Sequence, residues 1–111
     1  MNQVNALQSW AQERADLVEK AAAFAVAVQT AKGRSLSGIV WDAETVVSAA
    51  ESLTGDRVVV RSEVDRFDAE VAALDLATDV AVLRVRSGLA LPARGTSATL
   101  RSGQPVLMVG R

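Results

Sequence analysis

The 111-residue chain contains neither cysteine nor histidine. Without thiols there is no disulfide and no cysteine nucleophile, and without imidazoles there is no histidine general base. The same two absences exclude thiolate and imidazole ligands for zinc and similar metals. Few catalytic mechanisms remain open to such a chain. The redox compartment stays undetermined, because a protein without thiols is indifferent to it.

The sequence also has no excess of charge of one sign and no long apolar run. Twelve basic and thirteen acidic side chains give a formal net charge of −1, with no block of like charge. This balance disfavours a protein that binds nucleic acid or a membrane surface through a basic face. No apolar run approaches the roughly 20 residues that span a bilayer, so we expect no membrane span. Residues 1–20 are polar and lack the apolar core of a signal peptide.

An amphipathic helix is predicted near the N-terminus. From Asn5 to about Ala22 apolar side chains recur at helical spacing, and neither glycine nor proline interrupts the segment. The apolar stripe consists of Leu7, Trp10, Ala11, Leu17, Val18 and Ala21, and Arg14 interrupts it. We expect this stripe to pack against the chain's own domain rather than to be reserved for a partner.

After Ala22 the pattern changes to short β-rich runs separated by turn residues. Strands are predicted at residues 24–29, 36–41, 45–49, 57–61, 67–73, 80–86 and 105–109. No helical segment remains to connect parallel strands, so an antiparallel, all-β barrel or sandwich is expected. Small interior residues suit the narrow lumen of a barrel, and we favour a six- or seven-stranded one. The chain then divides into a helix at 1–22 and a barrel domain at 23–111.

The most informative segment is 75–85, which reads Asp-Leu-Ala-Thr-Asp-Val-Ala-Val-Leu-Arg-Val. It resembles the segment that carries the catalytic aspartate in HtrA/Deg-type, trypsin-like serine proteases. Residues 36–40 resemble the family's Gly-Ser-Gly strand, with Leu36 in place of its first glycine, and residues 46–53 resemble the strand and short helix that present its histidine. Residues 95–110 resemble a loop and the strand that closes the first barrel. The resemblance covers residues 16–111 and implies the fold of that barrel.

The resemblance also implies two site positions. Asp79 matches the aspartate of the catalytic triad, whereas Glu51 occupies the position of the histidine. The serine and its oxyanion hole belong in this family to a second barrel, which these residues do not include. The triad needs an imidazole to take the proton of the serine, so we expect no functional catalytic residue, no enzymatic activity and no cofactor. Asp79 should be buried, and we expect its carboxylate to accept hydrogen bonds from backbone N–H groups, such as those near Glu51 or the local donors of the Thr78-Asp79 turn.

Two neighbouring carboxylates could support other chemistry, such as glycoside hydrolysis or the binding of a hard cation. A glycosidase, however, needs a sugar-binding groove lined by aromatic side chains, and the chain has two Trp, two Phe and no Tyr. One carboxylate pair also falls short of the six to eight oxygen ligands that Ca²⁺ prefers. We therefore expect no metal site, and we interpret Glu51 as a solvated residue on a short helix.

The first functional hypothesis is a non-catalytic trypsin-like domain, a pseudoprotease, that acts through protein contacts. The alternative is an N-terminal fragment of a longer HtrA-like serine protease or pseudoprotease whose second barrel is missing from this chain. Apolar residues lie where the two barrels would meet: Leu89, Leu91, Leu100 and Leu107. They predict a homodimer or a complex with another protein. The resemblance implies an extracytoplasmic, periplasmic location, although no signal peptide is present in the chain.

Overall fold

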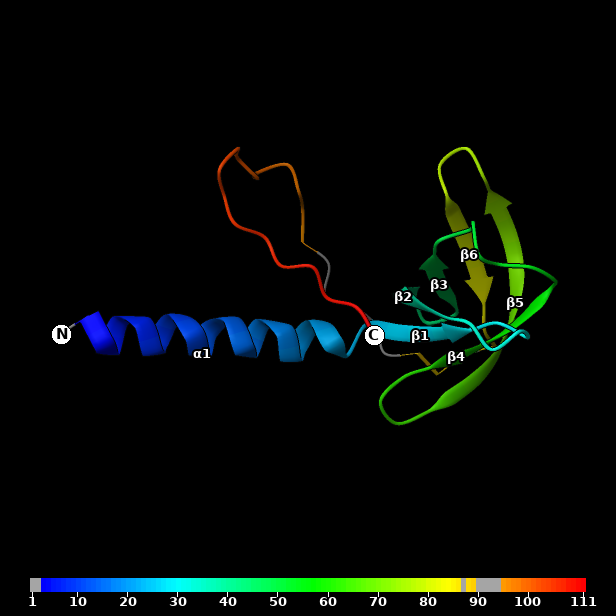
Figure 1. Cartoon of the computed structure of the whole chain (residues 1–111), viewed down its shortest axis with the longest axis horizontal. Coiled ribbons are helices and arrows are strands. Elements are labelled where there is room, and N and C mark those ends of the chain that lie inside the picture. Colours follow the sequence, from blue (N-terminus) through cyan, green and yellow to red (C-terminus); the bar gives the residue numbers. More distant parts are fainter. Residues whose placement is uncertain (1–2, 87, 90–94) are drawn as a thin grey trace.

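The computed structural model describes residues 3–86, 88–89 and 95–111, which form one helix followed by a closed β-barrel (Figure 1). The elements are α1 (Gln3–Ala22), β1 (Ala25–Gln29), β2 (Ser35–Asp42), β3 (Thr45–Ser48), β4 (Arg57–Arg61), β5 (Arg66–Asp75) and β6 (Val80–Arg84). All neighbouring strands are antiparallel, in the order β1-β2-β3-β6-β5-β4, and β1 closes the barrel by pairing with β4. The predicted all-β, barrel class is confirmed.

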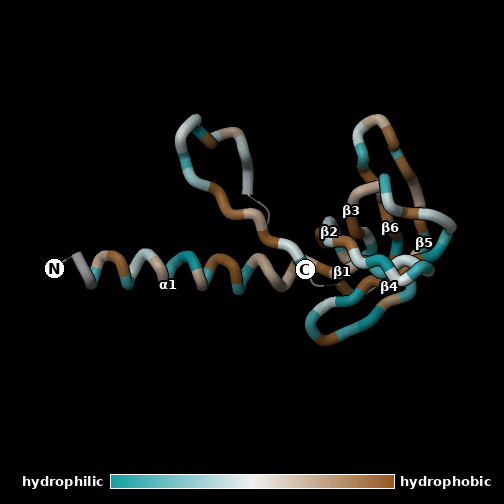
Figure 2. Tube along the Cα trace, viewed as in Figure 1, coloured by the Kyte–Doolittle hydropathy of each residue, from teal (hydrophilic) through white to brown (hydrophobic). Residues whose placement is uncertain are grey.

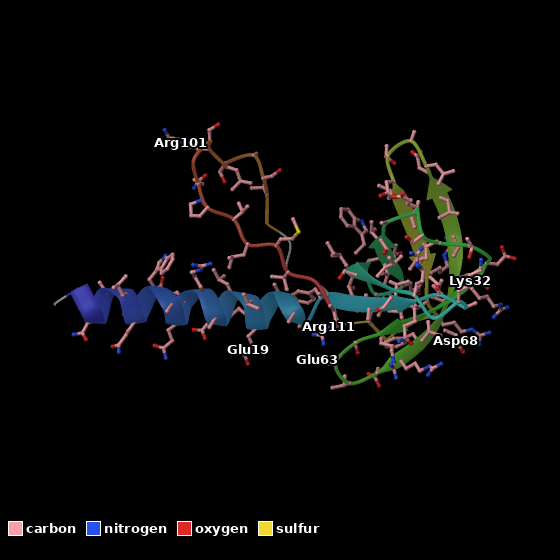
Figure 3. All side chains as sticks on the ribbon, in the orientation of Figure 1. Glu19, Lys32, Glu63, Asp68, Arg101 and Arg111 are labelled. Carbon is pink, nitrogen blue, oxygen red and sulfur yellow. The ribbon has the colours of Figure 1, made fainter. Side chains whose placement is uncertain are left out.

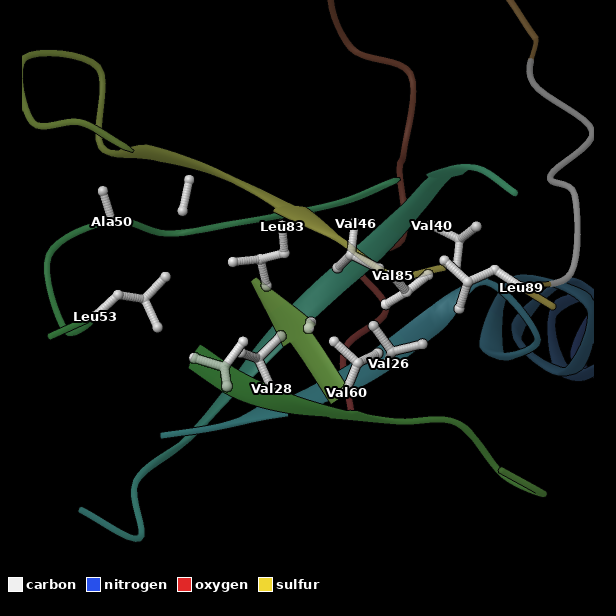
Figure 4. Packing of buried hydrophobic residues seen from close by; sticks show 13 residues of the cluster. Val26, Val28, Val40, Val46, Ala50, Leu53, Val60, Leu83, Val85 and Leu89 are labelled. Atoms are coloured by element: carbon white, nitrogen blue, oxygen red, sulfur yellow. The ribbon is translucent and has the colours of Figure 1, made fainter. Parts of the chain in front are cut away.

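The barrel lumen is filled by residues that alternate along the strands, as the period of two in the sequence predicts. The largest fully buried side chains are Leu83, Val26, Val28, Val40, Val46 and Val60. Figure 4 shows these side chains converging between the strands. Because nearly all of them are valines, the lumen is narrow. At Gly38 it has no room for a side chain: a Cβ there would lie 2.8 Å from Val46 Cγ1.

In β5 the predicted alternation of buried and exposed residues fails at Ala73. The alternation in residues 67–73 predicts that Ala73 faces the core together with Ala69. Ala69 is buried, whereas Ala73 is exposed. A register shift between Val71 and Ala73, in the pairing of β5 with β6, explains the difference, since a β-bulge reverses the face on which the following residues lie.

The seventh predicted strand does not form. Residues 105–109 are described in the structure, and no strand is found there. The physical reason is closure, because β1 pairs with β2 on one side and with β4 on the other, which leaves no open edge to receive another strand. The segment instead runs back to the junction between α1 and the barrel (Figure 1).

At that junction Arg111 ties three parts of the chain together (Figure 3). Its Nε donates a hydrogen bond to the Ala25 carbonyl at 2.8 Å, and its Nη2 donates to the Ala22 carbonyl at 2.9 Å. Nη2 also lies 3.2 Å from Glu63 Oε1. Ser37 Oγ accepts from the backbone N–H of Arg111 at 2.9 Å. Since Ala22 ends α1, the guanidinium satisfies one of the carbonyls that a helix C-terminus leaves without a donor.

The helix α1 does not fold back over the barrel, so the expected packing of its apolar stripe on its own domain is wrong. Every side chain described from Asn5 to Lys20 is exposed, and the helix extends away from β1 (Figure 1). Only Ala23 and Phe24 separate α1 from β1. The helix therefore leads almost directly into the strand and points away from the barrel (Figure 1). In the part of the chain that the structure describes, no helix has both the length and the apolar character to cross a membrane.

Candidate functional site

The candidate site lies where β3 ends and β6 begins. The two strands are antiparallel, with Val47 opposite Val82 and Ser48 opposite Ala81. Continuing this register by two residues places Ala50 opposite Asp79. The backbone follows it, since the Ala50 N–H donates to the main-chain carbonyl of Asp79 at 3.3 Å. Two segments about 30 residues apart in sequence are thereby joined at one end of the barrel.

The Asp79 carboxylate completes this junction. Its Oδ1 accepts a hydrogen bond from the Ala50 N–H at 2.9 Å and another from the Glu51 N–H at 2.8 Å. The expectation that Asp79 binds backbone N–H groups near Glu51 is thus confirmed. Its predicted burial is wrong: Asp79 is exposed, because it ends the turn of the β5–β6 hairpin, outside the barrel lumen. Its φ of 58° lies in the left-handed region, which Asp tolerates better than most residues do.

Glu51 is exposed and lies in a turn rather than on the predicted short helix. The turn is closed by a hydrogen bond from the Leu53 N–H to the Ala50 carbonyl at 3.1 Å. Ala50 and Leu53 are buried on either side of it, so this turn holds the Glu51 backbone firmly while its side chain faces solvent. The structure therefore brings the two residues together: the backbone N–H of Glu51 contacts the side chain of Asp79.

The chemistry open to this arrangement is limited. One oxygen of Asp79 is occupied by two N–H donors, and the side chain of Glu51 is an exposed carboxylate. Among the described residues, no group of three or more acidic side chains is placed to hold a metal ion. What the site does provide is a rigid link between β3 and β6.

The closed antiparallel barrel is the fold that the resemblance implies. A family model described as the trypsin-like peptidase domain matches residues 36–111, which is more than half of the chain. The chain belongs to this family. The match begins in β2 and includes both Glu51 and Asp79. Among curated proteins, no sequence matches the chain.

The apolar residues predicted for an interface differ in their exposure in this trypsin-like domain. Leu89 is 7% exposed and belongs to the core, where it packs at the end of the barrel beside Val26 and Val40 (Figure 4), so its predicted exposure is wrong. Leu100 and Leu107 are exposed. Leu91 lies outside the described residues. Val106 and Met108 are exposed as well, which makes the segment before Gly110 apolar and uncovered (Figure 2).

A second apolar surface, which sequence reasoning missed, lies on the outside of the barrel. Ile39 and Trp41 of β2 point outward and are 56% and 51% exposed. Ile39 pairs with Val47 of β3, which in turn pairs with Val82 of β6, so an apolar row crosses three strands. The signal was present in the sequence, since Ile39-Val40-Trp41 has apolar residues on both faces of one strand, a pattern typical of strands covered on both sides.

A hollow of about 670 Å³ lies on the surface away from Asp79. It is lined by charged residues of both signs: Glu44, Arg57, Arg66, Asp68, Glu70, Arg84 and Arg86. Across the strands Glu70 lies between Arg57 and Arg84, so acidic and basic side chains alternate over this face. Such a surface suits solvation, and it does not concentrate charge of one sign on a ligand.

Proposed function

We propose that this chain is a non-catalytic trypsin-like domain, a pseudoprotease of the HtrA/Deg type, that acts through protein–protein contacts. The observation that carries the proposal is the pairing of Asp79 with the backbone of Glu51. Asp79 fits the position of the triad aspartate, and the residue that it would have to orient is a glutamate. No imidazole exists anywhere in the sequence to replace it. A carboxylate at that position has no ring N–H through which the triad aspartate could orient it and stabilise its protonated form.

Contacts with other proteins are supported by the uncovered apolar residues. Three separate groups are exposed: the stripe along α1, the outward residues Ile39 and Trp41 of β2, and Leu100 with residues 106–108. Soluble monomers seldom leave contiguous apolar surface open, and such patches mark interaction sites. A homodimer or a complex with another protein chain would cover them.

The alternative is that the domain is one part of a longer HtrA-like protease or pseudoprotease. The apolar segment 106–108 supports this reading, because it lies outside the closed barrel and keeps its side chains available to a further domain. The length of the encoded reading frame distinguishes the two cases. In either case, Glu51 in the position of the histidine would still prevent turnover in this barrel.

The test is hydrolysis of casein and of peptide esters by the purified chain. We expect rates equal to those of buffer, and we expect the same of Glu51→His, since restoring the imidazole supplies neither a nucleophile nor an oxyanion hole. Glu51→Gln is the matched control, because it alters the same exposed position without adding a base. Stoichiometric labelling of one serine by a serine-directed phosphonate would overturn the proposal.

A further inference from the structure

The helix α1 carries an apolar seam that nothing in the described chain covers. Leu7, Trp10, Arg14, Leu17 and Ala21 follow one another at alternating steps of three and four residues, the spacing of the a and d positions in a coiled coil. Leu7, Trp10 and Leu17 are 63%, 55% and 58% exposed. Figure 2 shows the apolar residues recurring along the helix beyond the barrel.

A helix of this kind depends on packing. With 20 residues and a rise of 1.5 Å per residue, α1 is about 30 Å long. Helices in water draw most of their stability from an amphipathic face that packs against something, and propensity alone leaves them marginal. The seam therefore needs an occupant, and the occupant must match the one polar residue in its centre.

We infer that the occupant is α1 of a second copy of this chain, paired antiparallel. This inference rests on the proposed function, and it names the partner. The spacing is self-complementary in one register, in which Leu7 lies against Leu17 of the second copy and Trp10 lies against Arg14 of the second copy. Each a position then meets a d position, and the two-fold axis crosses the interface at the level of residue 12.

Arg14 decides between antiparallel and parallel pairing. Within one chain its guanidinium carbon lies 4.5 Å from the centre of the Trp10 ring, which is a cation–π distance. In the antiparallel register each Arg14 also meets the indole of the other chain, so the two rings and two cations form two adjacent layers. In a parallel register Arg14 would face Arg14 across the seam, and two like charges would be desolvated together.

The flanks and the ends of the helix agree with the antiparallel register. Near the axis Ala11 meets Ala11 of the second copy, which allows close approach of the two backbones. On the other flank Glu13 meets Glu13, a like-charge contact that salt screens. Raising the ionic strength should thus leave the dimer intact or strengthen it. Because each barrel follows the C-terminus of its own helix, antiparallel pairing places the two barrels at opposite ends.

Cross-linking tests the register directly, since the chain has no cysteine of its own. Two full-length variants, Leu7→Cys and Leu17→Cys, are purified with tags of different size and mixed, and a short bismaleimide linker is added. We expect the mixed 7–17 product to dominate over the 7–7 and 17–17 products. Dominance of the two homotypic products would overturn the antiparallel arrangement.

Sedimentation equilibrium of the unmodified chain tests whether the helices pair at all. We expect twice the monomer mass at micromolar concentration, and a dissociation constant raised at least about tenfold in Leu17→Asp, which would bury an unpaired carboxylate. Gln12→Asp, with the same charge on the opposite side of the helix, should remain dimeric. A monomer mass at high micromolar concentration, or a dimer that Leu17→Asp does not weaken, overturns the pairing while the hydrolysis result stands. Hydrolysis by a chain that dimerises would instead refute the non-catalytic proposal alone.

Discussion

Removing the Asp79 carboxylate should weaken the junction between β3 and β6. Its Oδ1 accepts two backbone hydrogen bonds, at 2.9 and 2.8 Å. A hydrogen bond to a charged group contributes about 1.5–3 kcal/mol. Asp79 is exposed, so water can replace part of each bond. On that basis we assign about 1 kcal/mol to each, and Asp79→Ala should lower the free energy of unfolding by about 2 kcal/mol.

Two further substitutions at the same position separate the hydrogen bonds from the backbone conformation. Asp79→Asn keeps an acceptor oxygen and tolerates the positive φ of 58°, so it should cost about 1 kcal/mol or less. Asp79→Gly loses both hydrogen bonds, but glycine removes the strain of the left-handed conformation, which costs about 1 kcal/mol. The stability of Asp79→Gly should therefore lie between those of Asp79→Asn and Asp79→Ala. Chemical denaturation of all three variants measures the order.

The control is Asp75→Ala, at the end of β5 where the same hairpin turn begins. Asp75 Oδ1 accepts one local hydrogen bond, from the Ala77 N–H at 3.0 Å, and joins no separate segments. We expect a loss well below that of Asp79→Ala. Equal stability of Asp79→Ala and the unmodified protein, or a larger loss for Asp75→Ala, would refute the reasoning that Asp79 links β3 to β6.

Two other substitutions test the core and the helix junction. Gly38→Ala places a Cβ 2.8 Å from Val46 Cγ1 and 3.0 Å from Val28 Cγ2. Overpacking should lower the free energy of unfolding by about 1–3 kcal/mol, measured by thermal unfolding. An unchanged melting temperature would contradict the narrow lumen. Arg111→Met removes the donors to the carbonyls of Ala22 and Ala25, and hydrogen exchange should quicken in the last turn of α1 while the barrel core stays protected. Uniform quickening in both would show that Arg111 does not act locally.

The barrel could be predicted from the sequence because its signals are local. Alternation with a period of two places Val26, Val28 and Val46 in the lumen, and turn residues bound the strands that carry them. The strand expected at 105–109 has the same apolar composition, but no composition reveals that β1 and β4 already pair. Closure depends on the whole chain, and a local pattern does not contain it.

The sequence could predict which residues meet at the candidate site, but it could not predict how exposed they are. The register of β3 and β6 follows from strand order, so the meeting of Asp79 with Ala50 and Glu51 could be expected from the resemblance. Its exposure could not, since that depends on how far the β5–β6 hairpin extends beyond the lumen. The position of α1 was missed for a similar reason: the apolar stripe indicates that something packs there, and it does not indicate what.

The way Asp79 is held also explains how this barrel can fold with a glutamate at position 51. Both donors to Asp79 are main-chain N–H groups, which every residue except proline provides. The link between β3 and β6 is therefore independent of the side chain at 51, which is exposed and makes no contribution to the core. We expect the free energy of unfolding of three variants, Glu51→Gln, Glu51→His and Glu51→Ala, to lie within about 0.5 kcal/mol of that of the unmodified protein, as expected of surface substitutions. Glu51→Pro removes one of the two N–H donors, so its free energy of unfolding should be well below that of the other three variants. If all four values agree, the backbone hydrogen bonds are not what holds this end of the barrel.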